Sequence, residues 1–202
     1  MKTVLCFGDS NTFGYIPDGL GRFSESERYT GILSTLLGSE YNVVEDGVVG
    51  RTTMFEDPLR TGKCGIKDIK KSVLTANPDI FVVALGTNDV KKVFNNSESS
   101  ICSGVESIIK TVLSLKPDTE IIVMAPAPIS SNALTKSDDY DLHSLEVSKN
   151  LHKKLEKYSK EHNYRYLNIG SFASVSPEDG EHLAAESHKM TAEKLYDIIK
   201  NI

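Results

Sequence analysis

The chain has 202 residues, of which 39% are hydrophobic and 25% are charged, and its formal net charge is −5. This composition is typical of a globular protein and excludes collagen, low-complexity disorder and a disulfide scaffold. The length predicts one domain over residues 1–202. Acidic residues outnumber basic ones by 28 to 23, and lysine doublets are isolated, which argues against a nucleic-acid partner because phosphates would be repelled.

The cysteines and the N-terminal segment predict where the protein resides. Cys6, Cys64 and Cys102 form no Cys-x-x-Cys pair, so we expect neither a zinc ribbon nor a disulfide framework. This cysteine usage favours a reducing compartment, the cytoplasm. The apolar run from Val4 to Phe7 is shorter than the roughly 7 apolar residues of a signal peptide. It is also far shorter than the roughly 20 of a membrane span, so we expect no membrane partner.

Short apolar runs alternate along the chain with longer segments of helical periodicity. The predicted order is strand Thr3–Phe7, helix Tyr29–Leu37, strand Tyr41–Val44, strand Ile80–Leu85, helix Val105–Leu115, strand Ile121–Ala125, helix Leu142–Tyr158, strand Tyr166–Ile169 and helix His188–Ile199. Such alternation predicts a three-layer α/β/α domain around a parallel sheet. Two long irregular stretches, Asn11–Arg28 and Gly50–Gly65, are typical of functional loops.

Polar residues follow several of the predicted strands. Ser10 follows the first strand, Gly50 the second, Asn88 the third, and Asp179 and His182 the fifth. Because parallel strands end at one edge of a sheet, these residues are expected to share that edge. The fold would then bring together residues that lie far apart in the sequence.

These residue types are sufficient for acyl transfer. His182 can take the proton of Ser10, and Asp179, three residues earlier, can hold the imidazole in one tautomer. The backbone N–H groups of Ser10 and Gly50 and the side-chain amide of Asn88 can stabilise a developing oxyanion. A glycine at position 50 would let the backbone approach the substrate closely.

Each of these features also has a purely structural interpretation. The tripeptide Gly8-Asp9-Ser10 is also typical of a turn or a helix N-cap. Asp179-Gly180 is typical of a turn, and Asn88 is typical of a helix cap. Other histidines, namely His143, His152 and His162, are interpreted as solvated helix residues. No Gly-x-Ser-x-Gly elbow, complete P-loop or His-Glu-x-x-His metal motif is present.

Together, the four blocks resemble those of the SGNH hydrolases, the GDSL esterase/lipase group, over nearly the whole chain. The blocks are Phe7-Gly8-Asp9-Ser10, Gly47-Val48-Val49-Gly50, Gly86-Thr87-Asn88-Asp89 and Asp179-Gly180-Glu181-His182. The resemblance implies a flavodoxin-like sheet of strand order 2-1-3-4-5, no cofactor and no metal. It also implies that Ser10 is the nucleophile, that Asp179 and His182 complete the triad, and that Ser10, Gly50 and Asn88 form the oxyanion hole.

Further positions narrow the resemblance to the small bacterial arylesterase and acyltransferase branch, for which we expect a homo-oligomer. These are Glu45-Asp46-Gly47, Arg51-Thr52-Thr53, Asp57-Pro58 and Lys91. Many relatives have Asn where Asp46 stands, so no role is transferred to that position.

The predicted function is a serine esterase that acts on short acyl groups of small soluble esters, by hydrolysis or by transfer to another alcohol. Candidate pocket residues are Asn11, Phe13, Tyr15 and Arg51. The rings of Phe13 and Tyr15 are equally compatible with packing under the loop. Arg51 is also compatible with pairing to Asp46. Alternative predictions are a carbohydrate deacetylase or a thioesterase using the same residues, and a non-catalytic domain that binds an anion through backbone donors.

Overall fold

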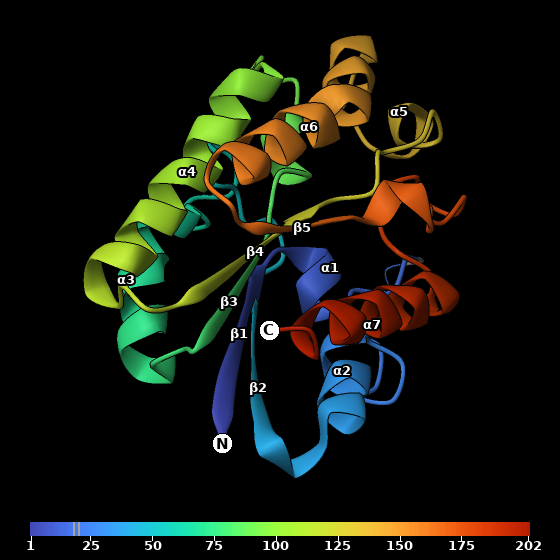
Figure 1. Ribbon diagram of the computed structural model, residues 1–202. Helices are drawn as coiled ribbons and strands as arrows, with labels where there is room; N and C mark the ends of the chain where they lie inside the picture. The colour runs from blue at the N-terminus through green and yellow to red at the C-terminus, as the bar shows by residue number, and fades with distance from the viewer. Residues whose placement is uncertain (18, 20) are drawn as a thin grey trace.

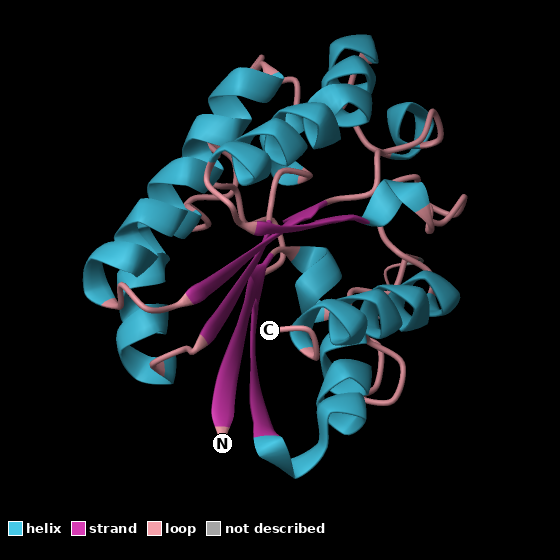
Figure 2. Ribbon diagram, in the orientation of Figure 1, coloured by secondary structure: helices cyan, strands magenta, loops and turns pink. Residues whose placement is uncertain are grey.

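The sheet has five parallel strands in the order β2-β1-β3-β4-β5, which confirms the predicted order (Figures 1 and 2). The computed structural model describes residues 1–17, 19 and 21–202. The strands are β1 (Lys2–Gly8), β2 (Tyr41–Gly47), β3 (Ile80–Ala84), β4 (Glu120–Ala125) and β5 (Arg165–Asn168). The chain crosses from β1 to β2 and then back past β1 to β3, so the loops after β1 and β3 diverge at the carboxyl edge.

Helices cover both faces of the sheet and give the predicted three layers. The helices are α1 (Ser10–Phe13), α2 (Tyr29–Leu37), α3 (Gly65–Ala76), α4 (Glu98–Leu115), α5 (Ala133–Lys136), α6 (Leu142–Glu161) and α7 (Ala185–Ile199). The structure also has three short 3-10 helices, which are η1 (Gly38–Glu40), η2 (Asn88–Val90) and η3 (Ile169–Ser171). In Figure 1, α3, α4 and α6 lie on one face, and α2 and α7 lie on the other.

The two-residue period of the strands divides the core into two. In β1, Leu5 and Phe7 point into the cluster under α3, α4 and α6, whereas Val4 and Cys6 point into the cluster under α2 and α7. All four side chains are at most 1% exposed. A strand covered on both faces in this way needs a continuous apolar run, which is why β1 could be recognised from the sequence.

Several local features differ from the prediction: the short helices α1 and α5 were not predicted, and α4 begins at Glu98 rather than at Val105. Helix α3 was not predicted, although Ile66, Ile69 and Val73 have helical spacing and turn towards the core. In addition, Glu45 to Gly47 continue β2 rather than forming a loop. Because β2 is an edge strand and is only partly buried, it can carry charged side chains at its end.

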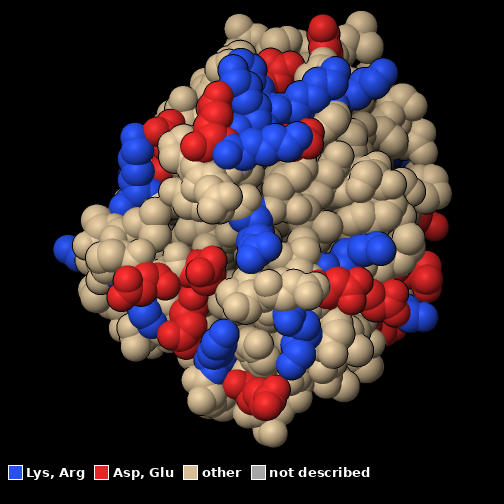
Figure 3. Space-filling view, viewed as in Figure 1, with Lys and Arg blue, Asp and Glu red and all other residues tan. Residues whose placement is uncertain are grey.

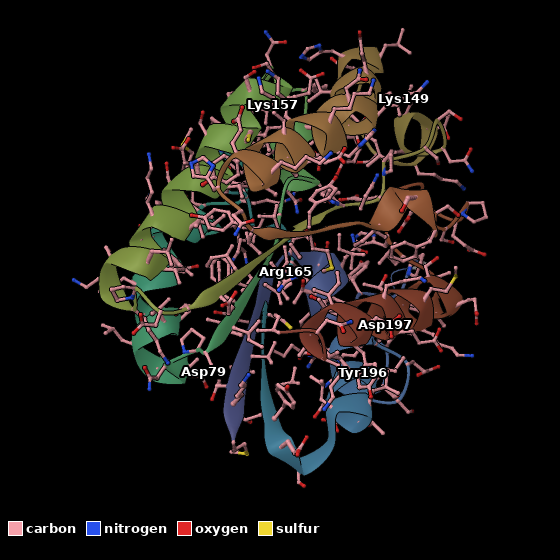
Figure 4. All side chains as sticks on the ribbon, in the orientation of Figure 1. Asp79, Lys149, Lys157, Arg165, Tyr196 and Asp197 are labelled. Atoms are coloured by element: carbon pink, nitrogen blue, oxygen red, sulfur yellow. The ribbon has the colours of Figure 1, made fainter. Side chains whose placement is uncertain are left out.

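At the amino edge of the sheet, Asp79 links neighbouring strands through hydrogen bonds; it lies just before β3 (Figure 4). Its carboxylate accepts the N–H of Thr3 at 2.8 Å and lies 3.3 Å from Lys116 Nζ, while its carbonyl accepts the N–H of Glu120 at 2.9 Å. These bonds tie β1, β3 and β4 together at their starting ends. The long connections therefore emerge at the opposite, carboxyl edge.

The surface mixes both signs of charge. Figure 3 shows basic side chains gathered over α6 with acidic side chains among them, and Figure 4 marks Lys149 and Lys157 on this helix. Lys160 pairs with Glu156 at 2.6 Å along the same helix. Among the described residues, no helix is both long and apolar enough to cross a membrane.

Candidate active site

Ser10, His182 and Asp179 form a continuous hydrogen-bonded chain at the carboxyl edge of the sheet. The Ser10 Oγ lies 2.9 Å from His182 Nε2, and His182 Nδ1 lies 2.7 Å from Asp179 Oδ2. Ser10 is 1% exposed and His182 is 8% exposed. Because Nδ1 faces a carboxylate, the proton belongs on Nδ1, which leaves Nε2 free to accept the proton of Ser10.

The local structure around Ser10 agrees both with a helix N-cap at Gly8-Asp9-Ser10 and with a reactive hydroxyl on Ser10. Asp9 is the N-cap of α1, and its carboxylate accepts the N–H of Asn11 at 2.9 Å. Ser10 is the first residue of this helix, so its own N–H has no intrahelical acceptor. The capping turn is therefore what presents both the hydroxyl and a backbone donor at the end of β1.

The turn that carries Asp179 and His182 is organised by the same carboxylate. Asp179 Oδ1 accepts the backbone N–H groups of Glu181 at 2.9 Å and His182 at 3.0 Å, while Oδ2 faces the imidazole. These bonds hold the pKa of Asp179 below its ordinary value even though burial alone would raise it. Burial likewise would lower the pKa of His182, but its bond to Asp179 and the negative charge of Glu181 outweigh burial and raise it.

Asn88 and Gly50 are brought together on the other side of Ser10. The Asn88 side-chain amide donates to the carbonyl of Arg51 at 3.2 Å, which places it directly beside the turn containing Gly50. That turn is joined to the end of β1 by the bond from Val48 N–H to the Gly8 carbonyl, 3.2 Å long. Within the described part of the chain, the Gly50 N–H donates to no other protein group.

The backbone conformation gives a reason of its own for a glycine at position 50. A Cβ there would meet only Arg60 Cδ, at 3.9 Å, so space does not require glycine. The backbone φ of +82° does, because side chains disfavour the left-handed region. Close approach is instead the property of Gly47, where a Cβ would lie 2.1 Å from Phe13 N.

The four candidate pocket residues have different surroundings. Tyr15 packs its ring 4.6 Å from that of His182. Asn11 Oδ1 accepts the N–H of Leu183 at 2.9 Å, and Phe13 lies under the guanidinium of Arg22, with 4.3 Å between the charge and the ring centroid. Of these three, only the Tyr15 ring packs directly against the Ser10–His182–Asp179 chain.

Arg51 makes several structural contacts, which favour the pairing with Asp46 over a place among the pocket residues. It is 2% exposed, and its guanidinium donates to the carbonyl of Gly8 at 3.0 Å and to the Asp46 carboxylate at 2.9 Å. It also lies 4.1 Å above the Phe7 ring. The residue therefore joins the ends of β1 and β2, and Asp46 serves as its partner.

A comparison with protein families matches residues 6–190 to the GDSL-like lipase/acylhydrolase family. The chain belongs to this family. This hydrolase therefore acts on carboxylic esters, and the interpretation as a non-catalytic anion-binding domain is wrong. The matched region contains all four sequence blocks, from Ser10 in the first to His182 in the last.

Solved structures superimpose on the hydrolase over its whole length. A carbohydrate acetylesterase from Sinorhizobium meliloti is 26% identical with a TM-score of 0.92, covering 100% of this chain and 99% of the other. A second carbohydrate acetylesterase family member from the same organism is 29% identical with a TM-score of 0.89, covering 99% and 98%. The M. smegmatis aryl esterase shares the fold at 24% identity, with a TM-score of 0.90 and coverage of 100% and 99%. No curated protein matches the chain.

Sequence reasoning missed two buried carboxyl groups behind the site of the hydrolase. Asp89 is fully buried, and its Oδ1 accepts the N–H of Thr53 at 2.8 Å, which ties the Gly50 loop to η2. Burial raises the pKa of Asp89 to about 7 and that of Asp9 to about 6. Their positions next to Asn88 and Ser10 were the available signal, but only the structure shows the burial.

A charged network also supports the Asn88 side of the hydrolase. Lys91, which is 3% exposed, lies 3.4 Å from Asp57 and 3.5 Å from Asp139. Arg60 pairs with the same Asp139 at 2.8 Å. The network joins the second long loop to the segment after η2, so Asp57 and Lys91 have a structural role in this protein.

Proposed function

We propose that the hydrolase is a serine esterase that removes short acyl groups from small esters through an acyl-enzyme on Ser10. The observation that carries the proposal is the chain of contacts from Ser10 Oγ to His182 Nε2 and from His182 Nδ1 to Asp179, at 2.9 and 2.7 Å. Both lengths are within hydrogen-bonding range, as nucleophile activation by a base requires.

The proposed reaction has two steps. The Ser10 oxygen attacks the ester carbonyl carbon while His182 Nε2 takes the hydroxyl proton, and the same proton then passes to the departing alkoxide. Water attacks the acyl-enzyme in the second step, giving its proton to His182 and releasing the acid and free Ser10. The carboxylate of Asp179 stabilises the imidazolium in both steps without itself being protonated.

The proposed oxyanion hole consists of the N–H groups of Ser10 and Gly50 and the amide of Asn88. Its support is that the Asn88 amide touches the carbonyl of Arg51, next to Gly50, while a second N–H of the same amide remains to be donated. Donors fixed before the substrate arrives cost no reorganisation during the reaction.

The preference for short acyl groups is supported by the narrow interior next to Asp9 and Asn11, the two neighbours of Ser10 in the chain. The cavity there is bounded by Thr12, Tyr29, Met124 and Leu183 and has a volume of about 10 Å³. That is about the space of one water molecule, so an extended acyl chain cannot enter the core on this side.

Acetylated sugars are the second candidate substrate class. The observation that favours them is the similarity to the carbohydrate acetylesterase from Sinorhizobium meliloti. The two classes share the same reacting groups and differ only in the alcohol that leaves.

The test is hydrolysis of p-nitrophenyl esters from acetate to laurate, with Ser10→Ala as the blank. We expect activity that falls with chain length and is lost in the variant, together with intact-mass detection of one phosphonate adduct on Ser10. A rate that peaks at the long esters contradicts the short-acyl proposal. An adduct that still forms in Ser10→Ala contradicts the nucleophile. Release of acetate from an acetylated oligosaccharide in parallel compares the two substrate classes.

A further inference from the structure

The turn carrying His182 rests on the loop that follows β4. Ser130 N–H donates to the carbonyl of Gly180 at 2.8 Å, and the side chain of Asn132 donates to the carbonyl of Pro177 at 2.7 Å. Both donors come from the segment that contains α5. The position of His182 is thus set by a part of the chain distant from it in sequence.

One side-chain contact in this interface involves a charge. The Tyr140 hydroxyl donates to the carboxylate of Glu181 at 2.6 Å. Tyr140 is 4% exposed and immediately precedes Asp141, the N-cap of α6, whose carboxylate accepts the N–H of Ser144 at 2.9 Å. The hydroxyl is therefore presented from a rigid position, and it fixes the carboxylate that directly precedes His182.

The other end of the same segment is attached to the Asn88 side of the site. The carbonyl of Asp139 accepts the N–H of Lys92 at 2.8 Å, two residues after η2 ends at Val90. Bonded residues thus run from η2 through Lys92, Asp139 and Tyr140 to Glu181. This route joins the segment that carries Asn88 to the turn that carries His182.

Charged and titratable groups surround the imidazole on several elements. They are Asp179 and Glu181 on its own turn, Asp9 before α1, Tyr15 after α1 and His188 on α7. The groups that face Glu181 are Tyr140, His182 and Asp9. Glu181 differs from Asp179 in that it makes no hydrogen bond to the ring among the described residues, so its effect on the ring is through charge.

We propose that Glu181 is a positioning residue, which Tyr140 holds so that a fixed negative charge stands beside the imidazole of His182. The proposal rests on the role of His182 in the proposed function. The charge favours the imidazolium that forms when Ser10 gives up its proton, and the hydrogen bond keeps the carboxylate from turning towards solvent. In agreement, the negative charge of Glu181 contributes to the raised pKa of His182, against the lowering effect of burial.

The direct test is an NMR titration of the His182 ring in the wild type and in Glu181→Gln, with the resonance assigned by its loss in His182→Gln. Glutamine keeps the size of the side chain and an oxygen that accepts the Tyr140 hydroxyl, but it removes the charge. We expect the midpoint to fall by about half a pH unit or more, since a neighbouring negative charge favours the imidazolium even in a water-like dielectric. The acidic limb of the kcat/KM profile should move in the same direction, with a lower plateau in kcat and little change in KM.

Three variants make the result specific. Glu178→Gln removes a charge from the same turn at an exposed position, and it should leave the midpoint unchanged. Tyr140→Phe should lower the midpoint less than Glu181→Gln, and adding it to Glu181→Gln should lower the midpoint no further. Asp9 is retained throughout.

Two outcomes overturn the proposal. One is a midpoint that does not move in folded Glu181→Gln, and the other is an equal movement in Glu178→Gln. The titration needs no substrate, so it remains decisive even if Ser10→Ala shows that the proposed ester chemistry is wrong.

Discussion

Asn11 Oδ1 accepts the backbone N–H of Leu183 at 2.9 Å, a bond between residues 172 positions apart. Asn11 follows Ser10 directly, and Leu183 follows His182 directly. The two halves of the Ser10–His182 contact are therefore fastened to each other one residue away from the reacting atoms. This relationship gives Asn11 a structural role that its place in the loop did not reveal.

Replacing Asn11 by Ala should lower both stability and turnover. The partly buried N–H of Leu183 would lose its acceptor, which costs about 1–3 kcal/mol, and the alignment of Ser10 with His182 would loosen. Asn11→Asp keeps an acceptor oxygen and should retain most of both properties. The measurements are urea unfolding and kcat on a short ester, and equal kcat in the Ala and Asp variants would contradict the prediction.

Replacing Asn88 by Ala should lower kcat by about 10²–10³ while changing KM little, because the amide is expected to act mainly on the oxyanion. A suitable control is Asn96→Ala, since Asn96 donates its amide to the Asp89 carbonyl at 3.0 Å and not towards Ser10. Steady-state kinetics with circular dichroism as the folding check would decide. Near-full turnover in folded Asn88→Ala would show that the oxyanion assignment is wrong.

The buried carboxyl of Asp89 should make the protein less stable as pH rises. Its folded-state pKa is raised to about 7 from 3.8, so between these values the folded state keeps a proton that the unfolded state releases. The free energy of unfolding contributed by this group therefore falls with increasing pH, by at most about 1.4 kcal/mol for each pH unit. Asp9, with its pKa raised to about 6, acts in the same direction.

Asp89→Asn isolates this contribution, because other titrating groups are common to both proteins. The unfolding free energy of the variant minus that of the wild type should increase from pH 4 to pH 7. The comparison matters because His188, whose burial lowers its pKa to about 4, contributes the opposite slope at the acidic end. Denaturant titrations at several pH values test this, and a difference that stays constant with pH would refute it.

Arg51→Met should destabilise the fold without affecting substrate binding. Removal of one partner of a buried ion pair typically costs about 3–5 kcal/mol, and here Asp46 and the Gly8 carbonyl would both lose a donor. Because the Asp46 side chain is 23% exposed and water can partly replace Arg51, we expect a loss of stability at the lower end of that range. Thermal unfolding should show the loss while KM for neutral esters stays the same, whereas a rise in KM with normal stability would restore Arg51 to the pocket.

The parts of this molecule that were predictable have strong local signals. The central strands β1, β3 and β4 were found because they are buried on both faces and so contain few polar residues. Helix α3 was missed although Ile66, Ile69 and Val73 carry its pattern, because frequent lysines around them obscure the apolar face. Glu45 and Asp46 were placed in a loop because an edge strand tolerates charges that a central strand would not.

The amino-acid sequence by itself determined the order of the strands and pointed to Ser10, Asn88, Asp179 and His182, which follow β1, β3 and β5 in short recognisable blocks. Only the tertiary structure decided the contacts between blocks. Asn11 could bond Leu183, Arg51 could pair with Asp46, and Tyr140 could hold Glu181 only after the sheet had brought their loops to one edge. Hydrogen bonds and burial between distant segments depend on where packing places them, and no local pattern encodes that.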